Sequence, residues 1–135
     1  MKETIVRYAA MLAFFGAFPW AYAAQPPADE PETVMITFHA KPGSESELAR
    51  AIAQHWATAR AMKLLAESPH LTLQGREKGK TYFIDIFTWR NAHIPDAAPL
   101  EIRKIWSEMN ALVESREGHP GLELDTVSVV APQPR

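Results

Sequence analysis

The residues of this 135-residue chain that could carry out chemistry are few, because the sequence contains no Cys. Thiol nucleophiles, disulfides and Cys-ligated zinc are therefore excluded. The five His residues show no H-x-H or H-x-x-x-H spacing of the kind that holds a metal ion, and we predict neither a metal site nor a cofactor. G-x-S-x-G, Walker A and G-x-G-x-x-G motifs are also absent, which argues against serine hydrolases, P-loop proteins and dinucleotide-binding enzymes.

Asp85 is the most suggestive acid, because it lies between Phe83 and Phe87 in an apolar run. Alternation along a strand puts these three side chains on one face, which we expect to point away from the helices. A carboxylate isolated there would have a raised pKa unless a cation or a hydrogen-bond donor meets it. Asp85 is then either a proton acceptor for a bound phenolic or carbon acid, or the partner of an Arg or Lys across a subunit interface.

His55 is the second candidate for catalysis. It is predicted to lie on the apolar stripe of a helix, one turn beyond Ala51 and Ile52, so its ring should be at least partly buried. Such an imidazole either makes a structural hydrogen bond or serves a pocket as a base or ligand-orienting group. The remaining histidines are expected at strand ends or in loops: His39, His70, His93 and His119.

Large aromatic residues could line a flat pocket for a small apolar or aromatic ligand. Trp106, on the second predicted helix, would form a wall of this pocket opposite an aromatic strand face that ends at Trp89. The alternative is that these side chains are ordinary core and interface residues. The predicted pocket residues are Phe83, Phe87, Trp89 and Trp106.

The elements that must position these residues follow the order strand, helix, two strands, helix, strand. Hydrophobic periodicity and turn residues place them at 33–41, 44–66, 70–75, 80–89, 100–118 and 122–130, with a loop at 76–79 and a capping box formed by Ser44 and Glu47. This order predicts an α+β fold, the ferredoxin-like β-α-β-β-α-β sandwich, with a four-stranded antiparallel sheet and both helices on one face.

Strand 80–89 is apolar on both sides, which bears on the oligomeric state. The side expected to pack on the helices carries Tyr82, Ile84 and Ile86. The other side carries Phe83, Phe87 and Trp89 and is too apolar to face water. The simplest cover is a second copy of the same sheet, so we predict a homodimer.

The first residues indicate export. Lys2 and Arg7 precede an uncharged apolar run and the small residues of an A-x-A site, so residues 1–23 are predicted to be a signal peptide cleaved after Ala23. An uncleaved membrane anchor is the alternative, although the apolar run is short for a span. Residues 24–32 are a predicted flexible leader, 33–131 the folded domain and 132–135 a tail. The protein is therefore expected in the periplasm or outside the cell, with no membrane span after cleavage.

Charge argues against nucleic acid as a partner. The chain has 14 Lys and Arg against 16 Asp and Glu, a net charge of −2, without a basic patch.

Four segments together resemble the dimeric α/β-barrel superfamily and, within it, the antibiotic-biosynthesis-monooxygenase-like (ABM) domain. They are the run 34–43 ending in Ala-Lys-Pro-Gly, the pair His55-Trp56, Tyr-Phe-Ile-Asp-Ile-Phe-Thr-Trp at 82–89, and Ile105-Trp106-x-x-Met109. The resemblance covers about residues 33–130. It implies two ferredoxin-like subunits with facing sheets, each with a pocket between its sheet and its second helix.

What the resemblance implies for function is broad. Members of the superfamily include cofactor-independent oxygenases of polycyclic phenols, haem-degrading enzymes, isomerases and proteins of unknown activity, and the fold does not choose among them. The favoured hypothesis is an exported homodimeric monooxygenase without a cofactor that acts on a small aromatic substrate, with Asp85 or His55 as the base.

Two other hypotheses remain. A non-enzymatic dimer that binds a small ligand or has a structural role in the cell envelope fits as well, because every candidate residue also has a structural interpretation. Haem binding or degradation is less favoured. The resembling enzymes use an axial His on the second helix, and this chain has no His between His93 and His119.

Overall fold

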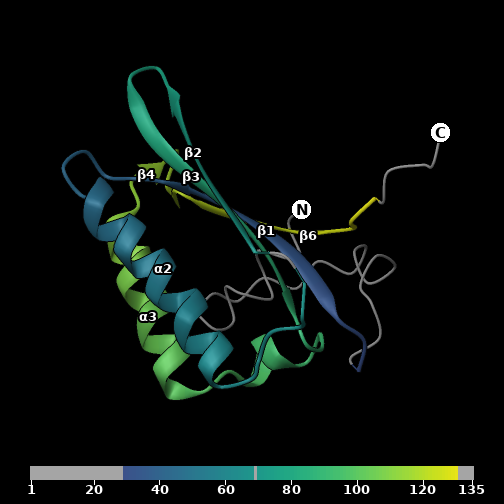
Figure 1. The fold of residues 1–135 in the computed structure, drawn as a ribbon. Coiled ribbons are helices and arrows are strands. Elements are labelled where there is room, and N and C mark those ends of the chain that lie inside the picture. Colours follow the sequence, from purple (N-terminus) through teal and green to yellow (C-terminus); the bar gives the residue numbers. More distant parts are fainter. Residues whose placement is uncertain (1–28, 69, 131–135) are drawn as a thin grey trace.

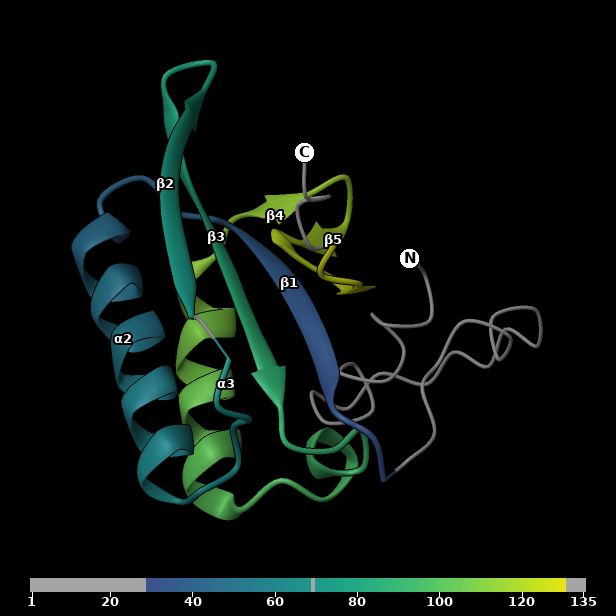
Figure 2. The same ribbon diagram turned by 45° about the vertical axis from the view of Figure 1, so that its right-hand side comes forward.

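The structure is a computed structural model that describes residues 29–68 and 70–130. Its main sheet has four antiparallel strands in the order β2-β3-β1-β6. The strands are β1 (Glu32–His39), β2 (Leu71–Glu77), β3 (Lys80–Trp89) and β6 (Leu122–Val127). Helices α2 (Glu45–Ala61) and α3 (Leu100–Leu112) lie side by side on one face of the sheet (Figures 1 and 2). The predicted α+β, ferredoxin-like arrangement is confirmed.

Strand β1 has the clean alternation expected from its sequence. The side chains that face the helices are fully buried: Val34, Ile36 and Phe38. Those on the outer face of the sheet are only partly buried: Met35, Thr37 and His39. This strand is hydrogen-bonded to β3 on one side and to β6 on the other, so its pattern defines the two faces of the whole sheet.

Helix α2 is shorter than predicted. It ends at Ala61, and Lys63 then turns the chain with a φ of 58°. Ser44 is the N-cap residue, yet its side chain makes no capping hydrogen bond, so the predicted capping box with Glu47 is not formed. The buried residues of α2 recur at helical spacing and define the face that packs on the sheet: Leu48, Ala51, Ile52, His55 and Ala59.

Strands β2 and β3 form the predicted hairpin, but with a tighter turn. Lys78 and Gly79 have φ values of 51° and 78°, the pattern of a two-residue type I′ turn. Glu77 therefore pairs with Lys80, and Arg76 belongs to β2 rather than to a four-residue loop. The hairpin extends beyond the end of the sheet (Figures 1 and 2).

The second half of the chain also differs in detail. A 3-10 helix, η2 (Ile94–Ala97), lies within the stretch between β3 and α3 that was expected to be irregular. Helix α3 ends at Leu112, well before Gly118, because a small hairpin of β4 (Ser115–Arg116) and β5 (His119–Pro120) occupies that stretch. Strand β6 ends at Val127 rather than at Val130.

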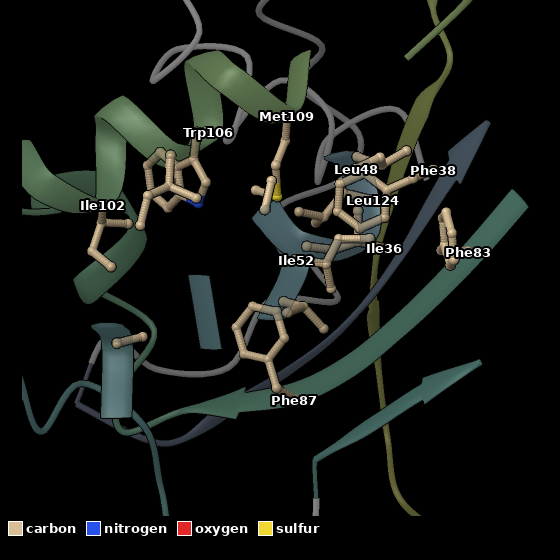
Figure 3. Close-up of a cluster of buried hydrophobic side chains, with 14 of the residues drawn as sticks. Ile36, Phe38, Leu48, Ile52, Phe83, Phe87, Ile102, Trp106, Met109 and Leu124 are labelled. Atoms are coloured by element: carbon tan, nitrogen blue, oxygen red, sulfur yellow. The ribbon is translucent and has the colours of Figure 1, made fainter. Parts of the chain in front are cut away.

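The faces of β3 are the reverse of those predicted. The buried side chains that face the helices are Phe83, Asp85, Phe87 and Trp89. The outer face instead carries the partly exposed Tyr82, Ile84 and Ile86. Register explains the reversal, because Asp85 is paired with Ile36, and paired residues of neighbouring strands share a face. Figure 3 shows Phe87 in one cluster with Ile52 of α2 and Met109 of α3.

The predicted signal peptide at 1–23, most of the leader at 24–32 and the tail at 132–135 lie outside the described residues. Within the described part, neither α2 nor α3 has the length and apolar character needed to cross a membrane.

Candidate functional site

Asp85 meets two polar partners at the edge of the sheet. Its Oδ1 accepts a hydrogen bond from Thr72 Oγ1 at 2.7 Å, and His70 Nε2 lies 2.5 Å from the same oxygen. The Asp85 side chain is 1% exposed, whereas that of His70 is 16% exposed. A buried carboxylate is thereby connected to the surface through a single imidazole, and not through the Arg or Lys that the structural interpretation expected.

Burial raises the pKa of Asp85 above its ordinary value. The hydrogen bond from Thr72 and the nearby His70 act in the opposite direction and favour the ionised form. The geometry thus places an imidazole and a hydroxyl against one oxygen of a buried carboxylate, an arrangement suited to acid-base chemistry.

The ring of His70 is supported from the side of helix α2. It stacks on Trp56 with a centroid distance of 4.7 Å and an interplanar angle of 13°. Arg60, one helical turn further along α2, places its guanidinium carbon 5.1 Å from the centre of the Trp56 ring. We call these residues, together with Thr72 and Asp85, the edge site, because β2 is an edge strand of the sheet.

His55, the other predicted base, lies in the core. It is 2% exposed, and its Nε2 accepts a hydrogen bond from the indole Nε1 of Trp106 at 2.9 Å. Its ring also lies edge-on to Phe87 and Trp89, with centroid distances of 5.4 and 5.8 Å. Burial, with a smaller contribution from His70, lowers the pKa of His55 to about 4. These contacts favour the structural interpretation of His55 as a neutral, buried hydrogen-bond acceptor.

Three of the four predicted pocket residues lie around His55. Phe87 and Trp89 meet edge to face with centroids 5.0 Å apart, and Trp89 meets Trp106 in the same way at 6.3 Å. Phe83 lies nearer the start of β3, in the same buried core (Figure 3). All four are buried side chains of the hydrophobic core, and their role in lining a substrate pocket stays a prediction.

His70 and Thr72 were missed as site residues, since His70 was expected at a solvent-exposed strand end. The residues of the turn between β2 and β3 could have placed both of them beside Asp85. A two-residue turn at Lys78-Gly79, counted back along both strands, pairs Thr72 with Asp85. Position 70 lies two residues earlier and therefore on the same side of the chain.

The described residues contain no group of three or more His, Asp or Glu side chains that could hold a metal ion.

Comparison with known proteins rests on structure, because no protein-family model and no curated protein sequence matches the chain. The cofactor-independent oxygenase SnoaB from Streptomyces nogalater is similar with a TM-score of 0.58 and 18% identity, over 78% of this chain and 99% of SnoaB.

Two proteins from Bacteroides thetaiotaomicron are similar as well. One, of unknown function and described as a possible oxidoreductase, has a TM-score of 0.58 and 13% identity over 74% of this chain and 98% of its own. The other, named for antibiotic biosynthesis monooxygenases, has a TM-score of 0.53 and 12% identity over 81% of this chain and 98% of its own. At these identities the similarity concerns the fold alone, and the chain shares the α+β, ferredoxin-like fold of these three proteins.

Proposed function

We propose that this protein is a monooxygenase-like enzyme that works without a cofactor, and that His70, backed by Asp85, is the base that deprotonates its substrate. The observation that carries the proposal is the buried Asp85 carboxylate joined to a partly exposed imidazole. A carboxylate costs free energy when it is buried, so a site that keeps one beside a titratable group is a candidate for acid-base work. Similarity to the fold of an oxygenase that needs no cofactor supports this choice of reaction.

The substrate class follows from what a protein base alone can achieve. Removing a proton from an electron-rich phenolic or carbon acid produces an anion that can pass electrons to dioxygen. For an activated CH2 group the reaction balances with one dioxygen consumed, one carbonyl oxygen formed and one water released. All four electrons then come from the substrate, and no external reductant is needed.

The test is oxygen uptake with a panel of naphthols, hydroquinones and activated arylmethylene compounds. We expect turnover that stops when dioxygen is removed and that incorporates one ¹⁸O atom from ¹⁸O₂. Replacing His70 by Gln should abolish it, while replacing the exposed loop residue His93 by Gln should not. Turnover that persists without dioxygen, or that survives in the His70→Gln protein, would contradict the proposal.

One observation favours the non-enzymatic alternative. Phe83, Phe87, Trp89 and Trp106 are buried and pack in the core, as expected for residues that only stabilise the fold. In that case His70→Gln and Asp85→Asn would change stability or ligand affinity, and no member of the substrate panel would be turned over.

Haem binding remains the less favoured hypothesis, since α3 contains no His.

We further propose that the protein is a homodimer, with its outer sheet face covered by a second copy. Apolar side chains continue across this face from strand to strand. They are Met35 on β1, Leu71 and Leu73 on β2, and Ile84 and Ile86 on β3. Leu71 and Leu73 are 48% and 45% exposed in the single chain. Burial of these apolar side chains against a second copy would favour association.

Export is the remaining part of the proposal and rests on the sequence of residues 1–23. Mass spectrometry of the protein purified from an expressing bacterium tests it, with a mature N-terminus at Ala24 expected.

A further inference from the structure

Three polar atoms of the edge site form a closed triangle. Thr72 Oγ1 lies 2.7 Å from Asp85 Oδ1 and 3.1 Å from His70 Nε2. His70 Nε2 lies 2.5 Å from Asp85 Oδ1. Each atom is therefore within hydrogen-bonding distance of the other two.

The chemistry of the three groups decides where the hydrogens lie. A threonine hydroxyl has one hydrogen, and Thr72 gives it to Asp85, because a carboxylate can only accept. The Thr72 oxygen can then only accept from His70. A hydrogen on His70 Nε2 satisfies both Thr72 and Asp85, whereas a bare Nε2 would set its lone pair against that of the Thr72 oxygen.

We propose that Thr72 is a positioning residue that keeps His70 in the tautomer with its hydrogen on Nε2. Nδ1 is then the atom that accepts a proton, and the edge site takes a ligand that offers an O–H, N–H or acidic C–H group. This ligand class deepens the proposed function and rests on it, while the tautomer follows from the triangle alone. Both hydrogen-bonding contacts of His70 in the described part of the chain involve Nε2, which leaves Nδ1 for a ligand.

The neighbouring contacts fit this role. Stacking on Trp56 fixes the plane of the His70 ring, so the hydrogen bonds need to set only the position of the hydrogen. Thr72 is on the edge strand β2 and is itself exposed, so a residue of the same size there leaves the packing of the hydrophobic core unchanged and removes only its hydrogen bonds to Asp85 and His70.

The tautomer can be read by ¹⁵N NMR of the His70 ring in three proteins: wild type, Thr72→Ser and Thr72→Val. Ser keeps the hydroxyl, whereas Val keeps the shape and the strand preference without it. We expect the Nε2–H tautomer in wild type and Thr72→Ser. In Thr72→Val the tautomer ratio should move by about fivefold toward Nδ1–H, the effect of one ordinary hydrogen bond. An Nδ1–H tautomer in wild type, or an unchanged ratio in Thr72→Val, would overturn the inference.

The ligand class is tested with 1-naphthol and 1-methoxynaphthalene, which share a ring system but differ in the donor. Addition of 1-naphthol should shift the Nδ1 resonance of His70, and 1-methoxynaphthalene should not. Equal shifts with both compounds, or none with either, would overturn the ligand assignment.

Kinetics separate this inference from the proposed function. If the oxygenase reaction is found, Thr72→Val should lower kcat more than it changes KM, and Thr72→Ser should restore kcat. If no substrate is turned over, the proposed function fails, whereas the tautomer assignment still stands or falls on the NMR result.

Discussion

Asp85 stabilises the fold least when it is charged, because burial raises its pKa in the folded state. Above the ordinary Asp pKa of 3.8 and up to the raised value, the folded chain binds the proton more tightly than the unfolded chain does. The contribution of Asp85 to stability therefore falls as the pH rises through this window.

Replacing Asp85 by Asn removes this dependence and keeps an oxygen that can accept from Thr72 and His70. We expect Asp85→Asn to gain stability relative to wild type on going from about pH 3.5 to about pH 7, while the proposed activity is lost. Urea unfolding of both proteins at the two pH values measures the change. A difference that shrinks as the pH rises would contradict the burial of an ionised Asp85.

His55 should have the opposite effect on how stability changes with pH. Its pKa falls from 6.5 in the unfolded chain to about 4 in the fold, so the unfolded chain binds more protons between these values. The contribution of the neutral ring is present above pH 6.5 and is lost as the pH falls toward 4, a change of about 3 kcal/mol.

The variant that tests this is His55→Gln, which does not titrate but can still accept a hydrogen bond from Trp106. It should lose less stability than wild type between about pH 7 and about pH 4.5. The exposed His93→Gln protein serves as the control and should behave like wild type. Equal acid sensitivity in all three proteins would mean that His55 does not have the depressed pKa.

At the scale of single residues, the sequence indicated Asp85 and His55 as candidate site residues but not the side chains that contact them. Burial of His55 could be predicted from its place on an apolar stripe, and Asp85 was conspicuous between aromatic residues. Their partners, Trp106 and His70, lie 51 and 15 residues away along the chain. The contact between His55 and Trp106 depends on how the two helices pack, which no local pattern encodes. The register that brings β2 to Asp85 could instead be counted from the Lys78-Gly79 turn.

At the scale of elements, the β2–β3 turn sets the register that brings Thr72 to Asp85. Gly79 has a φ of 78° and open space where a Cβ would lie, so Gly79→Ala would add conformational strain without a clash. We expect it to destabilise the protein by about 1 kcal/mol. Lys78→Asn should instead stabilise it by a few tenths of a kcal/mol, because Asn tolerates the left-handed conformation and Asn-Gly is the preferred type I′ pair.

Thermal unfolding of the two turn variants provides the measurement, with opposite shifts in Tm expected. Shifts of the same sign would show that this turn does not have the type I′ conformation.

The order of the elements was predictable because each strand and helix has its own hydrophobic period. The side on which β3 packs was not, since both of its faces are apolar. The predicted assignment placed Asp85, together with Phe83 and Phe87, on the face away from the helices. In the fold, the pairing of Ile36 with Asp85 ties β3 to the unambiguous pattern of β1, and Thr72 and His70 provide the hydrogen bonds that make the buried carboxylate tolerable.

At the scale of the whole molecule, the reversal of β3 changes the basis of the predicted dimer. Phe83, Phe87 and Trp89 are covered by the chain's own helices and cannot be the interface. The uncovered apolar surface lies on the opposite face, where Ile84 of β3 is flanked by Thr37 of β1 and Leu73 of β2. Substitutions that test dimerisation therefore belong on this face.

Ile84→Lys places a charge in the middle of the outer face without touching the helices. Full burial of a side chain such as Leu73 contributes about 1.5–3 kcal/mol, so several such residues can hold two sheets together and one buried Lys can separate them. Sedimentation equilibrium should show a dimer for the wild-type chain from Ala24 to Arg135 and a monomer for Ile84→Lys. Ser107→Lys, on the exposed side of α3, should leave the dimer intact. A wild-type chain that is a folded monomer at micromolar concentration, or an Ile84→Lys protein that still dimerises, would show that the outer face is not the interface.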